Sequence, residues 1–186
     1  MTISYNWLKD YISCDLTPEQ VCAALMSIGL EVDSLEKTEE IPGGLKGVIV
    51  AEVLECVEHP DSDHLHVTKL NTGSGEPLQV VCGAPNVAAG QKVLLATVGT
   101  VLGEDFKIKV SKIRGVESNG MICAEDELGI GTDHAGIMVL SPDAVPGTAA
   151  KDYLHLAEDY IIEIGLTAPR VDAASHSGVA ATSMPI

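Results

Sequence analysis

The middle of the chain carries short apolar or alternating segments, separated by turn residues at roughly 10–15-residue intervals. Separate short strands would leave exposed edges, and closing a sheet into a barrel removes those edges. Alternation is clearest at residues 106–110, where lysines and apolar residues take turns. We therefore predict a small barrel with five strands, at residues 48–54, 64–70, 78–82, 92–98 and 106–110.

The segment before this block carries the start and stop signals of a helix. Thr17 and Gln20 fit a capping box, and Pro18 suits the first helical position. Apolar residues then recur at helical spacing, and Gly29 is a natural end. A strand is expected directly afterwards, at residues 30–35.

The segment after the block has a second expected strand, at residues 160–164, and Asp172 or Ser175 can cap a short helix beyond it. Charged and turn-rich stretches at 36–44 and 141–147 read as connectors. Neither flank can bury a core alone, so we expect the two flanks to pair. The predicted fold is β-rich α+β: a discontinuous α+β domain of residues 1–39 plus 151–186, and an inserted barrel of residues 40–150.

Composition excludes several classes of protein. An apolar content of 46% suits a folded chain of 186 residues, and only six residues are aromatic, so the core must be aliphatic. The longest uncharged run, residues 77–91, is shorter than the about 20 residues that a membrane helix needs. The first seven residues lack the basic and apolar regions of a secretory signal, so a cytoplasmic location is expected.

The cysteines and histidines give no catalytic or metal motif. Five scattered cysteines without a CxxC pair favour free thiols in a reducing compartment over a zinc site or a disulfide. Histidines and aspartates gather at residues 59–66, but no HExxH is present and a third metal ligand would have to be guessed. Residues 83–86 lack the spacing of a phosphate-binding loop. The residues therefore indicate a binding surface without a catalytic centre.

The distribution of basic residues along the sequence indicates one location for this binding surface. The net charge of −16 is poor for generic attraction to phosphates. Four of the eleven basic residues nevertheless lie within eight positions, at Lys107, Lys109, Lys112 and Arg114, with no acidic residue among them. This run fits a phosphate-contacting surface, but a solvated strand that lysines protect from pairing is a common cause of the same pattern.

A glycine-containing loop follows the basic run, at residues 115–123. Ser118 and Asn119 can offer hydrogen bonds, and Met121 can offer an adaptable apolar contact. An ordinary turn between strands explains the same residues. The loop alone therefore does not indicate a binding site.

The central block resembles the OB-fold tRNA-binding domain of several aminoacyl-tRNA synthetases and free-standing tRNA-binding proteins. The resemblance covers about 100 residues. The matching motifs, in order, are His59-Pro60 with Asp63 and Leu65; Val81-Cys82-Gly83-Ala84-Pro85-Asn86-Val87; Gly90-Gln91-Lys92-Val93; Arg114-Gly115-Val116-Glu117-Ser118; Gly120-Met121-Ile122-Cys123; and Glu127-Leu128-Gly129.

The flanks resemble the start of the β subunit of bacterial-type phenylalanyl-tRNA synthetases. The motifs are Ser4-Tyr5-Asn6-Trp7-Leu8-Lys9-Asp10-Tyr11, Gly29-Leu30-Glu31-Val32, and Glu163-Ile164-Gly165-Leu166-Thr167 with Arg170, Asp172 and Ser175-His176. The chain departs from the family at Asp61 and His64, where Asn and Lys are usual, and at residues 167–170. The loss of one positive charge and the gain of a negative one should weaken phosphate contact near the His-Pro pair.

The resemblance implies an accessory tRNA-binding region that supports ATP-dependent attachment of phenylalanine to tRNA by an α subunit. It implies an α2β2 parent with ATP and Mg²⁺, no cofactor, metal or catalytic residue in this part, and no membrane. The alternative is a structural module that braces the subunits and has little tRNA affinity. The expected tRNA contacts are Lys107, Lys109, Lys112, Arg114, Ser118 and Met121, with Asn86 and His64 as further candidates.

Overall fold

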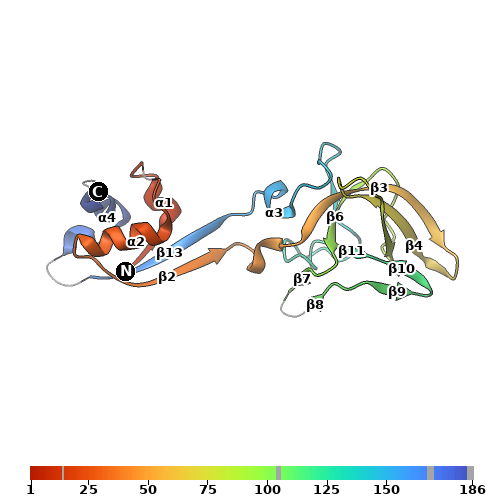
Figure 1. The fold of residues 1–186 in the computed structure, drawn as a ribbon, viewed down its shortest axis with the longest axis horizontal. Coiled ribbons are helices and arrows are strands. Elements are labelled where there is room, and N and C mark those ends of the chain that lie inside the picture. The colour runs from red at the N-terminus through yellow and green to blue at the C-terminus, as the bar shows by residue number, and fades with distance from the viewer. Residues whose placement is uncertain (14, 104–105, 167–169, 184–186) are drawn as a thin grey trace. The chain divides into compact units, whose positions relative to one another are not determined.

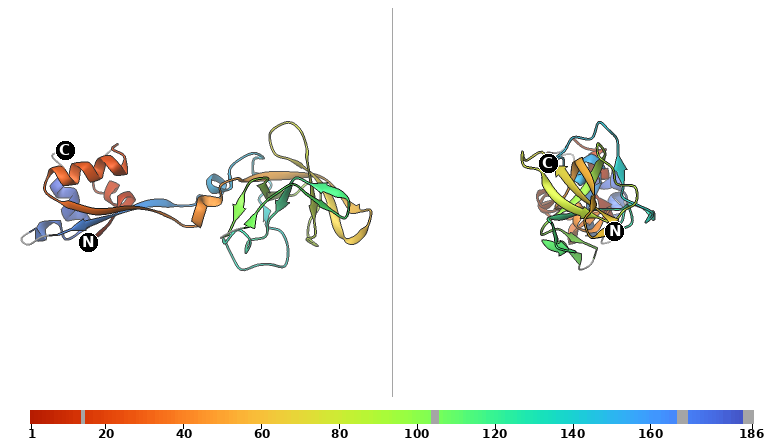
Figure 2. Two further views of the ribbon diagram at one scale, coloured as in Figure 1. Left: turned by 60° about the horizontal axis from the view of Figure 1, so that its bottom comes forward. Right: turned by 90° about the vertical axis from the view of Figure 1, so that its right-hand side faces the viewer.

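The structure is a computed structural model that describes residues 1–13, 15–103, 106–166 and 170–183 (Figures 1 and 2). The chain forms two compact units. One unit joins Met1–Glu40 to Ala157–Ile186, and the other is Ile41–Leu156. No helix in the described ranges is long and apolar enough to cross a membrane.

The first unit is a three-stranded antiparallel sheet covered by helices. Its strand order is β1 (Thr2–Ser4), β13 (Glu158–Gly165) and β2 (Glu31–Glu39), so the chain's two flanks pair directly. Helices α1, α2 and α4 lie on one side of this sheet in Figures 1 and 2. The core is almost entirely aliphatic, and its fully buried members include Ile3, Leu8, Leu25, Leu30, Ile162, Ile164 and Val179.

The helix signals before and after the barrel are confirmed. Helix α2 (Pro18–Ser27) begins at a complete capping box, in which Thr17 and Gln20 bond each other's backbone N–H groups. Helix α4 (His176–Ser183) begins after Ser175, whose hydroxyl accepts a hydrogen bond from the Gly178 N–H at 3.0 Å. The remaining helical turns of this unit are α1 (Tyr5–Lys9) and η2 (Val171–Ala173).

The second unit is β-rich and contains a nearly closed five-stranded antiparallel barrel, consistent with an OB-like fold. The Asn119 N–H donates to the Gln79 carbonyl at 2.9 Å, which brings the first and last strands of the sheet together. Val53, Leu70, Val80 and Leu95 are fully buried inside. The strand order is β11 (Gly120–Ile122), β6 (Lys92–Thr97), β3 (Val48–His59), β4 (Ser62–Asn71) and β5 (Leu78–Cys82).

Smaller elements surround the barrel. Strand β12 pairs with β6, while β7 pairs with β8 and β9 with β10 as separate two-stranded ribbons. Their bounds, with the two short helices, are η1 (Pro42–Leu45), β7 (Val101–Leu102), β8 (Phe106–Lys107), β9 (Ser111–Ile113), β10 (Val116–Ser118), β12 (Val139–Leu140) and α3 (Ala150–Tyr153).

Four of the five predicted barrel strands are confirmed within β3, β4, β5 and β6. The prediction of one continuous strand over residues 106–110 is wrong. Strand β8 ends at Lys107, because Ile108 turns inward, donates to the Thr100 carbonyl and accepts from the Gly99 N–H, both at 2.8 Å. The fifth barrel strand is instead β11, a three-residue segment in the predicted loop.

Candidate nucleic-acid interface

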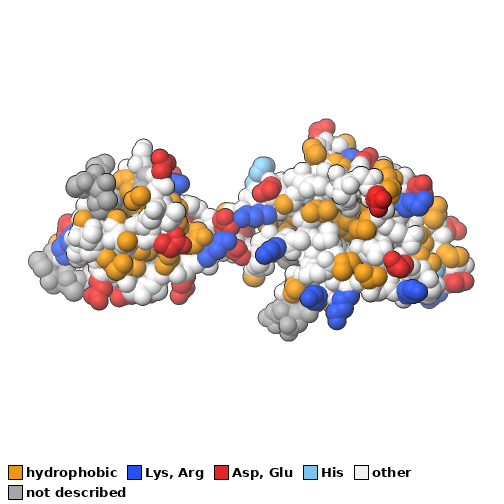
Figure 3. Space-filling model, in the orientation of Figure 1, with side chains coloured by type: hydrophobic (Ala, Val, Ile, Leu, Met, Phe, Trp, Pro, Cys, Tyr) orange, Lys and Arg blue, Asp and Glu red, His pale blue; other side chains and the backbone are white. Residues whose placement is uncertain are grey.

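Four exposed basic side chains follow one another from the end of β8, through the link to β9, to the turn after β9. We call Lys107, Lys109, Lys112 and Arg114 the basic edge. Figure 3 shows Lys and Arg side chains spaced over this part of the barrel. Among the described residues, none of the four takes part in an ion pair. Their charges are therefore available to an anionic partner.

Acidic residues interrupt the basic edge on one side. Lys112 lies opposite Glu117 in the β9–β10 register, and the Glu117 carboxylate accepts a hydrogen bond from the Asn119 amide at 3.1 Å. Lys107 lies opposite Val101 in the β7–β8 pair, where no charge opposes it. Among the described residues of this ribbon, Lys107 therefore faces no charged residue across the strand pair, whereas Lys112 faces Glu117.

Arg114 occupies an unusual backbone position. Its φ is +46° and that of Gly115 is +86°, as in a two-residue hairpin turn with both central residues left-handed. The Arg114 Nη1 donates to the Asp61 carbonyl oxygen at 2.7 Å. The acceptor is neutral, so the guanidinium keeps its positive charge at the surface.

Ser118 and Asn86 hold parts of the barrel together. Ser118 is 1% exposed; its hydroxyl accepts from the Val81 N–H and donates to the Gly120 carbonyl, both at 3.1 Å. The Asn86 side chain donates to the Ile137 carbonyl and accepts from the Ile137 N–H, both at 2.9 Å. Sequence reasoning offered no signal that these polar groups are already paired.

Met121 and His64 lie in different surroundings. Met121 is partly buried and lines an open hollow of about 350 Å³, together with Cys82, Gly83, Glu127 and His134. His64 is exposed near the β3–β4 turn, with its ring 3.4 Å from the Asp63 carboxylate. The structure therefore brings the four basic residues into one series but does not join Met121, Asn86 and His64 to it.

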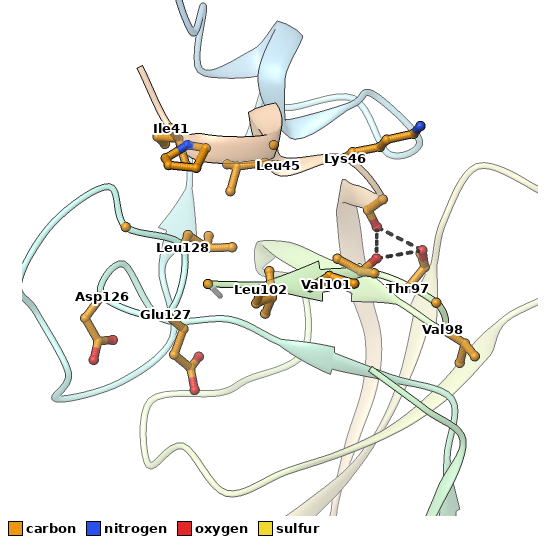
Figure 4. A pocket seen from close by; sticks show the side chains of 17 residues that line it. Ile41, Leu45, Lys46, Thr97, Val98, Val101, Leu102, Asp126, Glu127 and Leu128 are labelled. Carbon is orange, nitrogen blue, oxygen red and sulfur yellow. Dashed lines mark hydrogen bonds between the residues drawn. The ribbon is translucent and has the colours of Figure 1, made fainter. Parts of the chain in front are cut away.

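A larger apolar hollow lies at one end of the barrel (Figure 4). Its volume is about 1030 Å³, and Thr97 and Thr100 shape its wall by donating to the Gly47 carbonyl at 2.8 and 2.9 Å. Sequence reasoning missed it because its walls come from three distant segments. In Figure 4, Ile41 and Leu45 face Leu102 and Leu128, and Val98, Val101, Lys46, Asp126 and Glu127 complete the labelled walls.

The described residues form no cluster that could hold a metal ion, and burial keeps two of their thiols protonated. None of their His, Cys, Asp and Glu side chains forms a group of three that could hold a metal ion. His66 leaves a buried Nδ1 without a hydrogen-bond partner. Burial raises the pKa of the Cys82 thiol and raises the pKa of the Cys123 thiol to about 12, so both remain protonated.

Comparison with known proteins identifies the barrel. Residues 48–149 match the family described as "Putative tRNA binding domain", which is more than half of the chain. The chain belongs to this family. In solved structures, the C-terminal domain of Plasmodium vivax p43 aligns over 54% of this chain and 56% of its own, at 25% identity and a TM-score of 0.39.

Curated relatives extend the match to the flanks and confirm the resemblance seen in the sequence. They are phenylalanine–tRNA ligase beta subunits from Bacteroides thetaiotaomicron (63% identical), Porphyromonas gingivalis (55%) and Pasteurella multocida (45%). Each comparison covers 97% of this chain but 22% of the relative. The chain thus corresponds to about a fifth of the length of these relatives.

Proposed function

We propose that this chain is the tRNA-binding accessory region of a phenylalanine–tRNA ligase β subunit. The observation that carries the proposal is the basic edge, four cations that form no ion pair with the described residues, on a barrel of the tRNA-binding family. In the parent enzyme, an α subunit with ATP and Mg²⁺ attaches phenylalanine to tRNA, in an α2β2 assembly in the cytoplasm. This region supplies contact with tRNA and none of the reacting groups.

The chemistry of the edge favours recognition of the RNA backbone. Lysine and arginine neutralise phosphates and release counterions, which makes affinity depend steeply on salt. Stacking of successive bases needs several aromatic platforms, and the barrel unit has a single Phe, Phe106, which is 59% exposed and offers a platform for one base. We therefore propose that the barrel follows the shape of folded tRNA, with little dependence on base sequence.

The other predicted contacts take different roles in this proposal. Ser118 and Asn86 act indirectly, by holding the strand seam and the Ile137 loop in place. Met121 offers an apolar contact from its hollow, and His64 contacts RNA only at the hairpin margin. The strongest phosphate contacts come from Lys107 and Lys109.

Charge reversal tests the proposal. Equilibrium binding of the chain to an unmodified tRNA(Phe) transcript is measured between 20 and 200 mM salt for the wild type and for Lys107→Glu/Lys109→Glu. Loss of two phosphate contacts should lower the slope of log K against log salt by about 2. The control Lys9→Glu/Lys69→Glu changes net charge equally but replaces lysines elsewhere. Equal effects of the two pairs would show that net charge, and not the basic edge, sets affinity.

The bracing role remains a second candidate because of the large apolar hollow. Two valines at its wall, Val98 and Val101, are 46% and 53% exposed. We propose the α subunit as the occupant in that case. Val101→Glu should then weaken binding of the chain to isolated α subunit without tRNA, and should leave tRNA affinity unchanged. Failure of the wild-type chain to bind α subunit contradicts this role.

We also propose that the barrel is an insertion into a discontinuous α+β domain. The proposal is supported by the direct pairing of β2 with β13 and of β1 with β13. Residues 41–156 should fold alone, and residues 1–40 joined to 157–186 by a short linker should fold separately. Far-UV circular dichroism of both pieces checks this, and collapse of either piece into an unfolded chain contradicts it.

A further inference from the structure

Two hairpin tips meet beside the basic edge. The first is the turn at Pro60–Asp61, which joins β3 to β4, and the second is the turn at Arg114–Gly115, which joins β9 to β10. His59 lies at the end of β3 and is only 3% exposed. In the sequence, His59 stood out as a possible metal ligand and, with Pro60, as part of the motif shared with tRNA-binding domains.

The imidazole of His59 bridges the two tips. The Asp61 backbone N–H donates to His59 Nδ1 at 3.1 Å, so Nδ1 carries no proton. The proton of the neutral ring is therefore on Nε2, which donates to the Ile113 carbonyl oxygen at 3.1 Å. The ring thus joins its own turn to the last residue of β9.

Arg114 makes a further contact between the two tips, from the β9–β10 turn to the β3–β4 turn. Its guanidinium donates to the carbonyl of Asp61, the residue whose N–H already bonds His59. The three hydrogen bonds form a circuit through backbone groups and the neutral imidazole. No carboxylate takes part, so the circuit fixes the position of Arg114 without neutralising it.

The β9–β10 hairpin needs such an anchor. Its strands are three residues each and pair only with one another, and an isolated two-stranded hairpin is marginally stable. At the open end of the hairpin, the Ser118 hydroxyl accepts from the Val81 N–H, and the Gln79 side chain donates to the Glu117 carbonyl oxygen at 2.8 Å. The His59–Arg114 circuit holds the opposite end. Arg114 lies in the turn of this hairpin at a φ of +46°, which is uncommon for a residue other than glycine.

We propose that His59 is a positioning residue for tRNA binding: it locks the β9–β10 hairpin to the barrel and thereby fixes Lys112 and Arg114 for contact with RNA phosphates. His59 itself does not touch RNA. This inference rests on the proposed function and assigns the His-Pro pair a mechanical role within it.

Two substitutions separate positioning from packing. Asn at position 59 keeps an acceptor near the place of Nδ1 but is too short to reach Ile113. Gln reaches the place of Nε2 and keeps the bond to Ile113. Both remove the ring from the buried site, so both lose the packing contribution. His155→Asn makes the same chemical change at an exposed position and serves as control.

The readout is the salt slope of binding to the tRNA(Phe) transcript, which a loss of stability alone does not alter in folded protein. His59→Asn should lower the slope by about 2, matching Lys112→Gln/Arg114→Gln. His59→Gln should retain most of the slope. Added to the Lys112→Gln/Arg114→Gln background, His59→Asn should change nothing more.

Two results would overturn the inference while the proposed function stands. One is a wild-type slope for folded His59→Asn when Lys107→Glu/Lys109→Glu still lowers it. The other needs no variant: ¹⁵N NMR of the unchanged chain should show the His59 ring neutral with the proton on Nε2, and the opposite tautomer removes the circuit. If the unchanged chain shows no salt-dependent binding, the proposed function fails and takes this inference with it.

Discussion

Replacing Ser118 with Ala separates a structural role for this residue from direct contact with tRNA. The substitution removes the hydroxyl that pairs the Val81 N–H across the seam between β5 and β10. A buried donor left without a partner costs about 1–3 kcal/mol. The hydroxyl's own bond to Gly120 is lost at the same time, so we expect a loss of about 2 kcal/mol. At about 4 °C per kcal/mol, the barrel should melt about 8 °C lower.

Hydrogen exchange localises this effect. The Val81 amide should exchange faster in Ser118→Ala than in the wild type, because its acceptor is gone. Ser111→Ala is a matched control: Ser111 faces Ser118 in the β9–β10 register but is exposed, so its loss should change stability by less than about 0.5 kcal/mol. Fluorescence of Trp7, the single tryptophan, reports on the other unit and should be unchanged.

Folded Ser118→Ala should bind tRNA with the wild-type salt slope, because the hydroxyl faces the strand seam. Wild-type melting and wild-type exchange at Val81, combined with weaker tRNA binding, would refute it. That outcome would mean that the hydroxyl faces the RNA and not the seam.

Three further changes have definite expected results. Asp61→Asn removes a negative charge from the residue that Arg114 contacts, and it should raise tRNA affinity about threefold at low salt. The reason is that a surface charge several ångströms away contributes on the order of 0.6 kcal/mol. Unchanged affinity would place Arg114 outside the interface. Gly136→Ala puts a methyl group against the Asn86 side chain and should cost about 1–3 kcal/mol, with faster hydrogen exchange at the Ile137 amide; an unperturbed amide would contradict the contact. Burial raises the pKa of the Cys123 thiol above its value in the unfolded chain. The thiol's contribution to the free energy of unfolding is therefore complete below about pH 9 and is lost as pH rises toward 12. Between pH 8 and pH 10.5, the free energy of unfolding in urea should fall less for Cys123→Ala than for the wild type.

Local signals in the sequence predicted the regular elements well. The capping box at Thr17 fixes the start of α2, because its hydrogen bonds are all within one turn. Strand β5 was predicted with its observed bounds, since turn residues border it on both sides. These elements are specified by neighbours in the sequence, and their signals need no knowledge of the tertiary structure.

The sequence predicted that the two flanks pair, but it did not reveal which segment completes the barrel. The alternation at 106–110 is real, but Ile108 satisfies its backbone against Gly99 and Thr100, which breaks the strand. Exposed and buried polar groups also look alike in a sequence: the Ser118 side chain is buried in the barrel, whereas Lys107 is exposed. The partners that decide these cases lie in other segments: Gly99 and Thr100 for Ile108, and Val81 for Ser118.

The net charge of −16 leads to one more prediction about salt. The barrel unit holds eight basic and fifteen acidic residues, and four of the eight form the basic edge. At 0.15 M salt the screening length is about 8 Å, so RNA at the edge is influenced mainly by the edge itself. At 0.01 M it is about 30 Å, and the acidic background then repels the RNA. The plot of log K against log salt should therefore flatten below about 20 mM, where an uncompensated basic protein would continue to gain affinity. Titrations at 5, 10, 20, 50 and 100 mM test this, and a straight line through the lowest salt would mean that the acidic residues are too far from the bound RNA to act.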